Sequence, residues 1–259
     1  MTINQAFTIF QNAGGIRAAR IITENTKKFS RFSVWRIAKK LRHGVPVAKI
    51  IHKKWFFGLP FYTNKYTLDP RPDTETLVSS VISDINTDTS RRILDLGTGT
   101  GCIICALVKN IHASSGIAID KSWRALRVAR HNIKKLNLTE RIKTIRTSFD
   151  KAYKFSEKFD IIVSNPPYID ANDTRVNDGA MHDPKIALYA NDNGLAAYKA
   201  IAKNAKNWIK DSGKLYLEIG IDQGIDIKNI FINQGWDLQR TENDLGGIER
   251  VLIFKLAQK

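Results

Sequence analysis

The sequence predicts an α/β protein in which a parallel sheet carries helices on both faces, after a small helical region and a β-hairpin. Two observations predict the sheet: short apolar strands alternate with segments of helical periodicity, and a glycine-rich loop joins one strand to the next helix. A third is the helical spacing of the basic N-terminal stretch. We therefore expect a helical region over residues 1–52, a hairpin linker over 53–69 and an α/β domain over 70–259.

The N-terminal region is strongly basic. Its apolar residues, such as Ile16, Ala19 and Ile22, recur three and four apart, which is typical of helices. Residues 1–60 hold 12 Lys and Arg against one acid, Glu24, and so carry +11 of the net charge of +16. This charge indicates either a solvated helical face or a patch that attracts nucleic acid or an acidic partner, and both interpretations stay open.

The segment "WFFGLPFYTNKYTL" (55–68) predicts the hairpin, because aromatic and β-branched residues are interrupted at 58–60 and 64–65. After it, the predicted strands cover residues 92–96, 116–120, 142–147, 159–164 and 214–219. The predicted helices cover residues 102–110, 122–136 and 195–209. The tail, 249–256, predicts a last strand that is antiparallel and lies at or near an edge of the sheet.

Composition excludes several classes of protein. The longest apolar run has seven residues, 102–108, whereas a membrane span needs about 18. Two cysteines cannot build a disulfide framework and no secretory signal is visible, so we expect a cytoplasmic protein. Separately, we expect a monomer. The alternative is a mitochondrial presequence in the first 40 residues. We interpret Cys102 and Cys105 as core packing, and no histidine or cysteine spacing indicates a metal site.

The loop "ILDLGTGTG" (93–101) is the first candidate binding site. Its glycines let the backbone approach a ligand at the carboxyl end of a strand. A dinucleotide fingerprint fails because Cys102 replaces its third glycine, and a phosphate-binding loop fails because no Gly-Lys-Ser/Thr follows. The pattern favours S-adenosyl-L-methionine, with Asp120 at the ribose; the alternative is a tight turn that binds nothing. The candidate cofactor residues are Asp95, Gly97, Thr98, Gly99, Thr100, Gly101 and Asp120.

The segment "IIVSNPPYID" (161–170) is the second candidate binding site. The prolines end the strand at Asn165, and the loop opens on the same sheet edge as the glycines. A planar nitrogen is a poor nucleophile and has to be held and aimed. The side-chain oxygen of Asn165 and the carbonyl of Pro166 are suited to accept its two N–H bonds, while Tyr168 covers its flat face. We expect Asn165, Pro166, Pro167 and Tyr168 to bind substrate and carry the catalysis.

Several segments together resemble the PrmC/HemK family of release factor glutamine methyltransferases. They are "HGVPVAKI" (43–50), the hairpin, "PRPDTETLV" (70–78), "ILDLGTGTG", "IAID" (117–120), "VSNPPYI" (163–169), "LEIG" (217–220) and "DLGGIERVL" (244–252). The resemblance implies a class I methyltransferase fold with a seven-stranded, mostly parallel sheet. It also implies methyl transfer from S-adenosyl-L-methionine to N5 of the glutamine in the Gly-Gly-Gln motif of class I peptide-chain release factors, supporting translation termination.

The resemblance assigns the glycine loop, Asp120 and Asn165 to the cofactor and residues 165–168 to the glutamine amide. Phe149 stands where the family more often has an Asp followed by Trp, and we place it against the adenine. The region before His43 is shorter than the helical domain with which the family docks its partner.

Asn-Pro-Pro-Tyr is shared with other amino methyltransferases, so the substrate class has competitors. These are a nucleic-acid (adenine N6) methyltransferase, a ribosomal-protein glutamine methyltransferase and a non-catalytic cofactor-binding regulator. Residues 70–75 favour the release factor, because the ribosomal-protein enzymes differ there. Direct nucleic-acid binding by the basic region stays open, but we do not expect nucleic acid to be the substrate.

Overall fold

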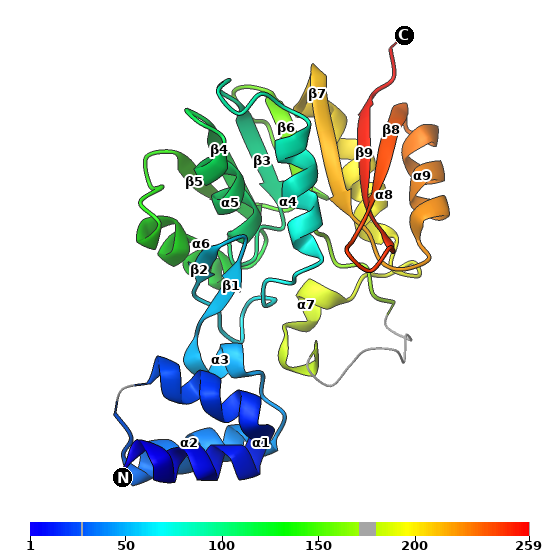
Figure 1. The fold of residues 1–259 in the computed structure, drawn as a ribbon. Helices are drawn as coiled ribbons and strands as arrows, with labels where there is room; N and C mark the ends of the chain where they lie inside the picture. Colours follow the sequence, from blue (N-terminus) through cyan, green and yellow to red (C-terminus); the bar gives the residue numbers. More distant parts are fainter. Residues whose placement is uncertain (27, 171–179, 259) are drawn as a thin grey trace.

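A computed structural model describes residues 1–26, 28–170 and 180–258 (Figure 1). Its main sheet has seven strands in the order β5-β4-β3-β6-β7-β9-β8. The five strands from β5 to β7 run parallel, whereas β9 is antiparallel to both of its neighbours. The strands are β3 Arg92–Leu96, β4 Ser115–Asp120, β5 Ile142–Arg146, β6 Phe159–Ser164, β7 Ile209–Glu218, β8 Trp236–Asn243 and β9 Glu249–Leu256. The predicted fold class is confirmed.

Helices cover both faces of this sheet (Figure 1). The helices are α1 Ile3–Asn25, α2 Arg31–Arg42, α3 Val47–Ile51, α4 Thr74–Ser83, α5 Cys102–Asn110, α6 Trp123–Lys135, α7 Lys185–Leu188, α8 Ala196–Asn204 and α9 Gly224–Asn233. Helices α4 and α5 pack on one face, with Ile133 of α6, and α8 and α9 pack on the other. The pleat supplies both cores: in β6, Ile161 joins the first cluster and Ile162 the second.

The helix predicted over residues 195–209 ends early. Helix α8 stops at Asn204, a 3₁₀ turn follows over Ala205–Asn207, and Ile209 already belongs to β7. The carbonyl of Trp208 accepts a hydrogen bond from the amide of Phe159 at 2.8 Å, which joins this point of the chain to β6. Trp208 and Ile209 both belong to the core, which they reach from the start of β7 and the residue before it.

Among the described residues, three α-helices and one strand were not predicted: α4, α7, α9 and β8. Strand β8 lies at the sheet edge and is mostly half-exposed, so its sequence "WDLQRTEN" lacks an apolar run. The hairpin is shorter than predicted, with β1 at Lys54–Phe56 and β2 at Leu59–Phe61. Leu59 and Pro60, which we expected to interrupt it, form part of β2.

The three N-terminal helices form a small core of their own, which includes Ala6, Phe10, Ile22 and Val34. Lys49 of α3 connects this region to the rest of the chain through ion pairs. Its buried ammonium pairs with Asp69 of the linker at 3.1 Å and with Asp183, just before α7, at 2.7 Å. Among the described residues, no helix is both long and apolar enough to span a membrane.

Candidate active site

The parallel register brings the candidate site residues to one edge of the sheet. Leu96 of β3 lies between Ile119 of β4 and Ser164 of β6, and Ser164 lies beside Leu217 of β7. The chain reverses its strand order across β3, since β4 and β5 lie on one side and β6 and β7 on the other. Open α/β sheets bind ligands at such a reversal, beyond the carboxyl ends of the strands.

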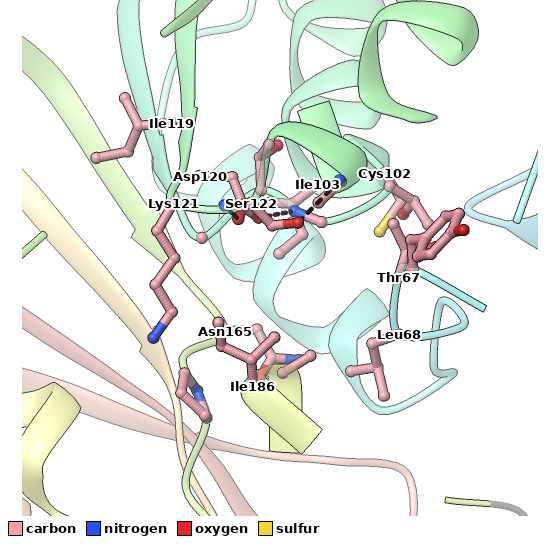
Figure 2. Close-up of a pocket in the computed structure, with 18 of the residues that line it drawn as sticks. Thr67, Leu68, Cys102, Ile103, Ile119, Asp120, Lys121, Ser122, Asn165 and Ile186 are labelled. Atoms are coloured by element: carbon pink, nitrogen blue, oxygen red, sulfur yellow. Dashed lines mark hydrogen bonds between the residues drawn. The ribbon is translucent and has the colours of Figure 1, made fainter. Parts of the chain in front are cut away.

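A cavity lies at this edge (Figure 2). Asp120 and Ser122 line one side, and Asn165 and Ile186 line the opposite side. The wall also takes residues from the linker and the start of α4, from the glycine loop, from the segment after β5 and from α7. These further lining residues include Asp69, Pro70, Arg71, Thr74, Gly97, Thr98, Gly99, Thr100, Cys102, Thr147, Ser148, Phe149, Pro167 and Ala187.

The three glycines of the loop have two different roles. Gly97, Gly99 and Gly101 have φ values of 73°, 55° and 79°, a region that side chains disfavour. Gly97 and Gly99 line the cavity together with Thr98 and Thr100. Gly101 is not in the lining: a Cβ there would lie 3.3 Å from the Cβ of Ala129, so this glycine allows α6 to pack closely.

The two candidate carboxylates occupy different places. Asp120 lines the cavity, and its two oxygens accept hydrogen bonds from the amides of Gly99 at 3.0 Å and Ser122 at 2.8 Å. Asp95 is fully buried and outside the lining; Oδ2 accepts a hydrogen bond from the Thr98 hydroxyl at 2.6 Å, and Oδ1 has no partner among the described residues. Burial raises the pKa of Asp95 to about 7 and also raises the pKa of Asp120.

Phe149 lies beside the glycine loop. Its ring lines the cavity, and its Cε1 would be 3.8 Å from a Cβ placed on Gly97. The side chain of Asn204, at the end of α8, donates a hydrogen bond to the carbonyl of Phe149 at 2.8 Å. This contact fixes the backbone from which the ring projects.

The Asn-Pro-Pro-Tyr loop contributes some of its residues to the cavity. Asn165 and Pro167 line it, whereas Pro166 is buried. The side-chain nitrogen Nδ2 of Asn165 donates a hydrogen bond to the hydroxyl of Thr74 at 3.1 Å. Tyr168 is not among the lining residues, and its ring lies 2.9 Å from the position of a Cβ on Gly220. Burial raises the pKa of Tyr168 to about 12.

Sequence reasoning missed three residues at this site: Thr74, Glu218 and Arg250. Glu218 is 2% exposed, its carboxyl lies close enough to the side chains of Thr74 and Asn165 for them to lower its pKa, and its Oε2 has no hydrogen-bond partner among the described residues. Arg250 of β9 is also buried and contributes a positive charge. The visible signal was an acid at the end of the apolar strand "LYLEIG", since a lone buried carboxylate is costly.

The cysteines of the C-x-x-C pair are both free and buried, on α5. Burial raises the pKa of Cys102 to about 12 and that of Cys105 well above its ordinary value. Thiols of this kind are unreactive at neutral pH. In the described parts of the chain, no group of three or more His, Cys, Asp and Glu side chains is placed to hold a metal ion.

Comparison with known proteins places this site in a family. Residues 72–226 match the family model described as methyltransferase small domain. The release factor glutamine methyltransferase of Agrobacterium fabrum is 42% identical over 218 residues, which cover 82% of this chain and 75% of that protein. The chain belongs to the release factor glutamine methyltransferase family.

Some of the relatives are about twice as long as this chain. The bifunctional methyltransferase of Rickettsia felis is 38% identical over 84% of this chain, which spans 46% of that protein. A methyltransferase structure from Pyrococcus furiosus superposes with a TM-score of 0.58 at 18% identity, covering 89% of this chain and all of that one. This last likeness shows the class I methyltransferase fold alone.

Methyltransferases of this family use S-adenosyl-L-methionine, and the cavity fits it on two counts. Gly97 and Gly99 leave open the space that Cβ atoms would fill, so backbone and ligand can approach closely. The carboxylate of Asp120, which lines the cavity, supplies an acceptor for ribose hydroxyls, whereas Asp95 is buried outside the lining.

Proposed function

We propose that this protein transfers a methyl group from S-adenosyl-L-methionine to N5 of the glutamine in the Gly-Gly-Gln motif of class I peptide-chain release factors. Family membership supports the substrate, and one observation carries the chemistry: Asn165 faces Asp120 across the cavity (Figure 2). When bound, the cofactor supplies an electrophilic methyl group on a sulfonium. The protein then has to hold a weakly nucleophilic amide nitrogen in line with it.

The Asn-Pro-Pro-Tyr loop is built for that task. The oxygen Oδ1 of Asn165 and the carbonyl of Pro166 accept the two N–H bonds of the glutamine amide. Two prolines fix the direction of these acceptors before the substrate arrives, so little reorganisation is needed. No base has to act before the transfer, because the nitrogen loses its proton only after it gains the methyl group. Tyr168 adjoins the acceptors and is proposed to cover the flat face of the amide.

On the cofactor side, we assign Asp120 to the ribose hydroxyls and Asp95 to the amino-acid end. The segment Gly97 to Gly101 provides the backbone, and Phe149 contacts the adenine. Asn165 adjoins both ligands. The lining positions of Gly97, Asp120 and Phe149 support these assignments.

The larger organisation follows the same proposal. We assign residues 1–52 to partner docking, 53–69 to a linker and 70–259 to catalysis, and the buried pair of Lys49 with Asp183 supports a fixed attachment between the first and third parts. The free, buried cysteines suit a reducing cytoplasm, and we expect a monomer.

Phe149→Ala is expected to raise the dissociation constant of S-adenosylhomocysteine about 10-fold, because the adenine loses an aromatic contact of about 1 to 1.5 kcal/mol. Isothermal titration calorimetry measures the affinity. Phe32→Ala is the matched control, since Phe32 lies on α2 and is 65% exposed. Unchanged affinity of the Phe149 variant would refute the adenine assignment.

The proposed substrate is tested by transfer of a labelled methyl group. The purified protein is incubated with a release factor, with its Gln→Ala variant at Gly-Gly-Gln, with ribosomal protein, and with DNA and tRNA. We expect label on the release factor alone. Label on nucleic acid or on ribosomal protein would replace the proposed substrate with one of its competitors.

A further inference from the structure

Three segments that carry the family resemblance have no part in the chemistry described above. They are "PRPDTETLV", "LEIG" and "DLGGIERVL". The structure brings a charged residue of each to the neighbourhood of Asn165: Asp73 just before α4, Glu218 at the end of β7 and Arg250 in β9. These segments are far apart in sequence and meet only in the fold.

The sheet register places Glu218 next to the catalytic loop. Ser164 pairs with Leu217 across the parallel strands β6 and β7, so the residues that follow, Asn165 and Glu218, are neighbours. Glu218 is almost completely buried, and the hydroxyl of Tyr198 donates a hydrogen bond to its carbonyl at 2.9 Å. The backbone of Glu218 is therefore fixed on both sides.

The side chains of Glu218, Thr74 and Asn165 lie together. Asn165 Nδ2 donates a hydrogen bond to Thr74 Oγ1 at 3.1 Å, and both side chains lie close enough to the buried Glu218 carboxyl to favour its ionised form. The Oε2 atom of Glu218 has no hydrogen-bond partner among the described residues, so this buried acceptor faces the group without one. An ionised carboxylate only accepts hydrogen bonds, so it selects the amide orientation that turns the NH₂ group toward it. The Asn165 oxygen is then left for the cavity, where the proposed function needs an acceptor.

We propose that Glu218 is a positioning residue that, with Thr74, holds the Asn165 amide in the one orientation that accepts a hydrogen bond from the substrate. The proposal rests on the proposed function of Asn165, and it adds the reason for that orientation. Because the positioning group is a carboxyl, the orientation of Asn165 also depends on the protonation state of Glu218.

The charged surroundings of Glu218 set that dependence. Burial raises the pKa of Glu218 to about 7, while the polar side chains of Thr74 and Asn165 and the charge of Arg250 favour ionisation. Asp73 opposes ionisation, and the hydroxyls of Tyr168 and Tyr198 also face this group. A protonated Glu218 becomes a donor and competes for the Asn165 oxygen. The ionised form positions Asn165, so kcat should rise with pH and level off above about 7.

The first test measures the kcat of variants at Glu218 and Thr74. Glu218→Gln keeps the shape but adds an NH₂ donor, so Asn165 can turn over. We expect kcat at saturating cofactor to fall about 10- to 100-fold, with an unchanged S-adenosylhomocysteine dissociation constant and a flat kcat profile across neutral pH. Thr74→Val should lower kcat and Thr74→Ser should restore it. Glu140→Gln, at an exposed position, is the control. Wild-type kcat and pH profile in Glu218→Gln would overturn the proposal.

The second test needs no substrate. In ¹⁵N-labelled protein, the Asn165 side-chain amide resonances, assigned by their loss in Asn165→Ala, should shift with a midpoint near the Glu218 pKa of about 7. They should not shift in Glu218→Gln. If the Asn165 side-chain resonances of the wild type did not shift with pH, the positioning role would be refuted. This outcome does not depend on whether the release factor is the substrate. Inactivity toward release factor with a normal amide titration would refute only the proposed function.

Discussion

Asn165→Ala is expected to reduce methyl transfer by about 1,000-fold or more, because the substrate nitrogen loses its aiming acceptor and the near-attack geometry. Cofactor affinity should change by no more than about threefold, since a single peripheral hydrogen bond is worth about 0.5 kcal/mol or slightly more. Single-turnover transfer at saturating cofactor measures the first quantity, and calorimetry with S-adenosylhomocysteine measures the second.

Asn110→Ala provides the matched control for this experiment. Asn110 ends α5, and within the described residues its side chain donates to the carbonyl of Ala106 alone, at 2.8 Å, away from the cavity lining. The control variant should turn over like the wild type. Near-normal turnover of Asn165→Ala would rule out the aiming role. A large loss of cofactor affinity would instead assign Asn165 mainly to the cofactor.

Asp95→Asn is expected to stabilise the free protein and weaken cofactor binding at the same time. The pKa of Asp95 is raised by burial from 3.8 to about 7, so between those values the folded state binds a proton that the unfolded state has released. The free energy of unfolding therefore falls as pH rises through this window and stays low above about 7. At 1.36 kcal/mol per pKa unit, the lost stability is of the order of 4 kcal/mol.

Urea unfolding of the ligand-free protein on either side of this window tests the sign. At pH 8, Asp95→Asn should be more stable than the wild type by a few kcal/mol, up to about 4, and the difference should vanish near pH 4. Asp88→Asn, at an exposed site, should show neither effect. Cofactor affinity of Asp95→Asn should drop, because a neutral amide no longer pairs with the ammonium. A variant that is destabilised at pH 8, or binds normally, would contradict this account.

Much of the fold could be predicted from the sequence, because its central strands are buried on both faces and read as short apolar runs. β3 and β6 are of this kind. β8 was not predictable in this way, because an edge strand is half solvated and its register with β9 depends on contacts far along the chain. The early end of α8 was missed for a related reason: Trp208 satisfies the helical pattern, yet its carbonyl bonds to β6.

The site residues also fall into those that the sequence predicts and those that it does not. Residues that follow strands, such as Gly97, Asp120 and Asn165, were predictable because parallel strands end at one edge. The places of Gly101, Asp95 and Tyr168 outside the cavity lining depend on packing against α6 and Gly220, which spacing does not encode. The place of Glu218 beside Asn165 depends on the register between β6 and β7, which the sequence does not encode locally.

Mass spectrometry of a reacted release factor tests the central claim most directly. The purified protein, S-adenosyl-L-methionine and the release factor are incubated, and the peptide that contains Gly-Gly-Gln is fragmented to locate the added methyl group. The account predicts one methyl group on the side-chain amide of that glutamine, and none when the protein carries Asn165→Ala. A methyl group on another residue, or an unmodified glutamine beside methylated nucleic acid, would contradict it.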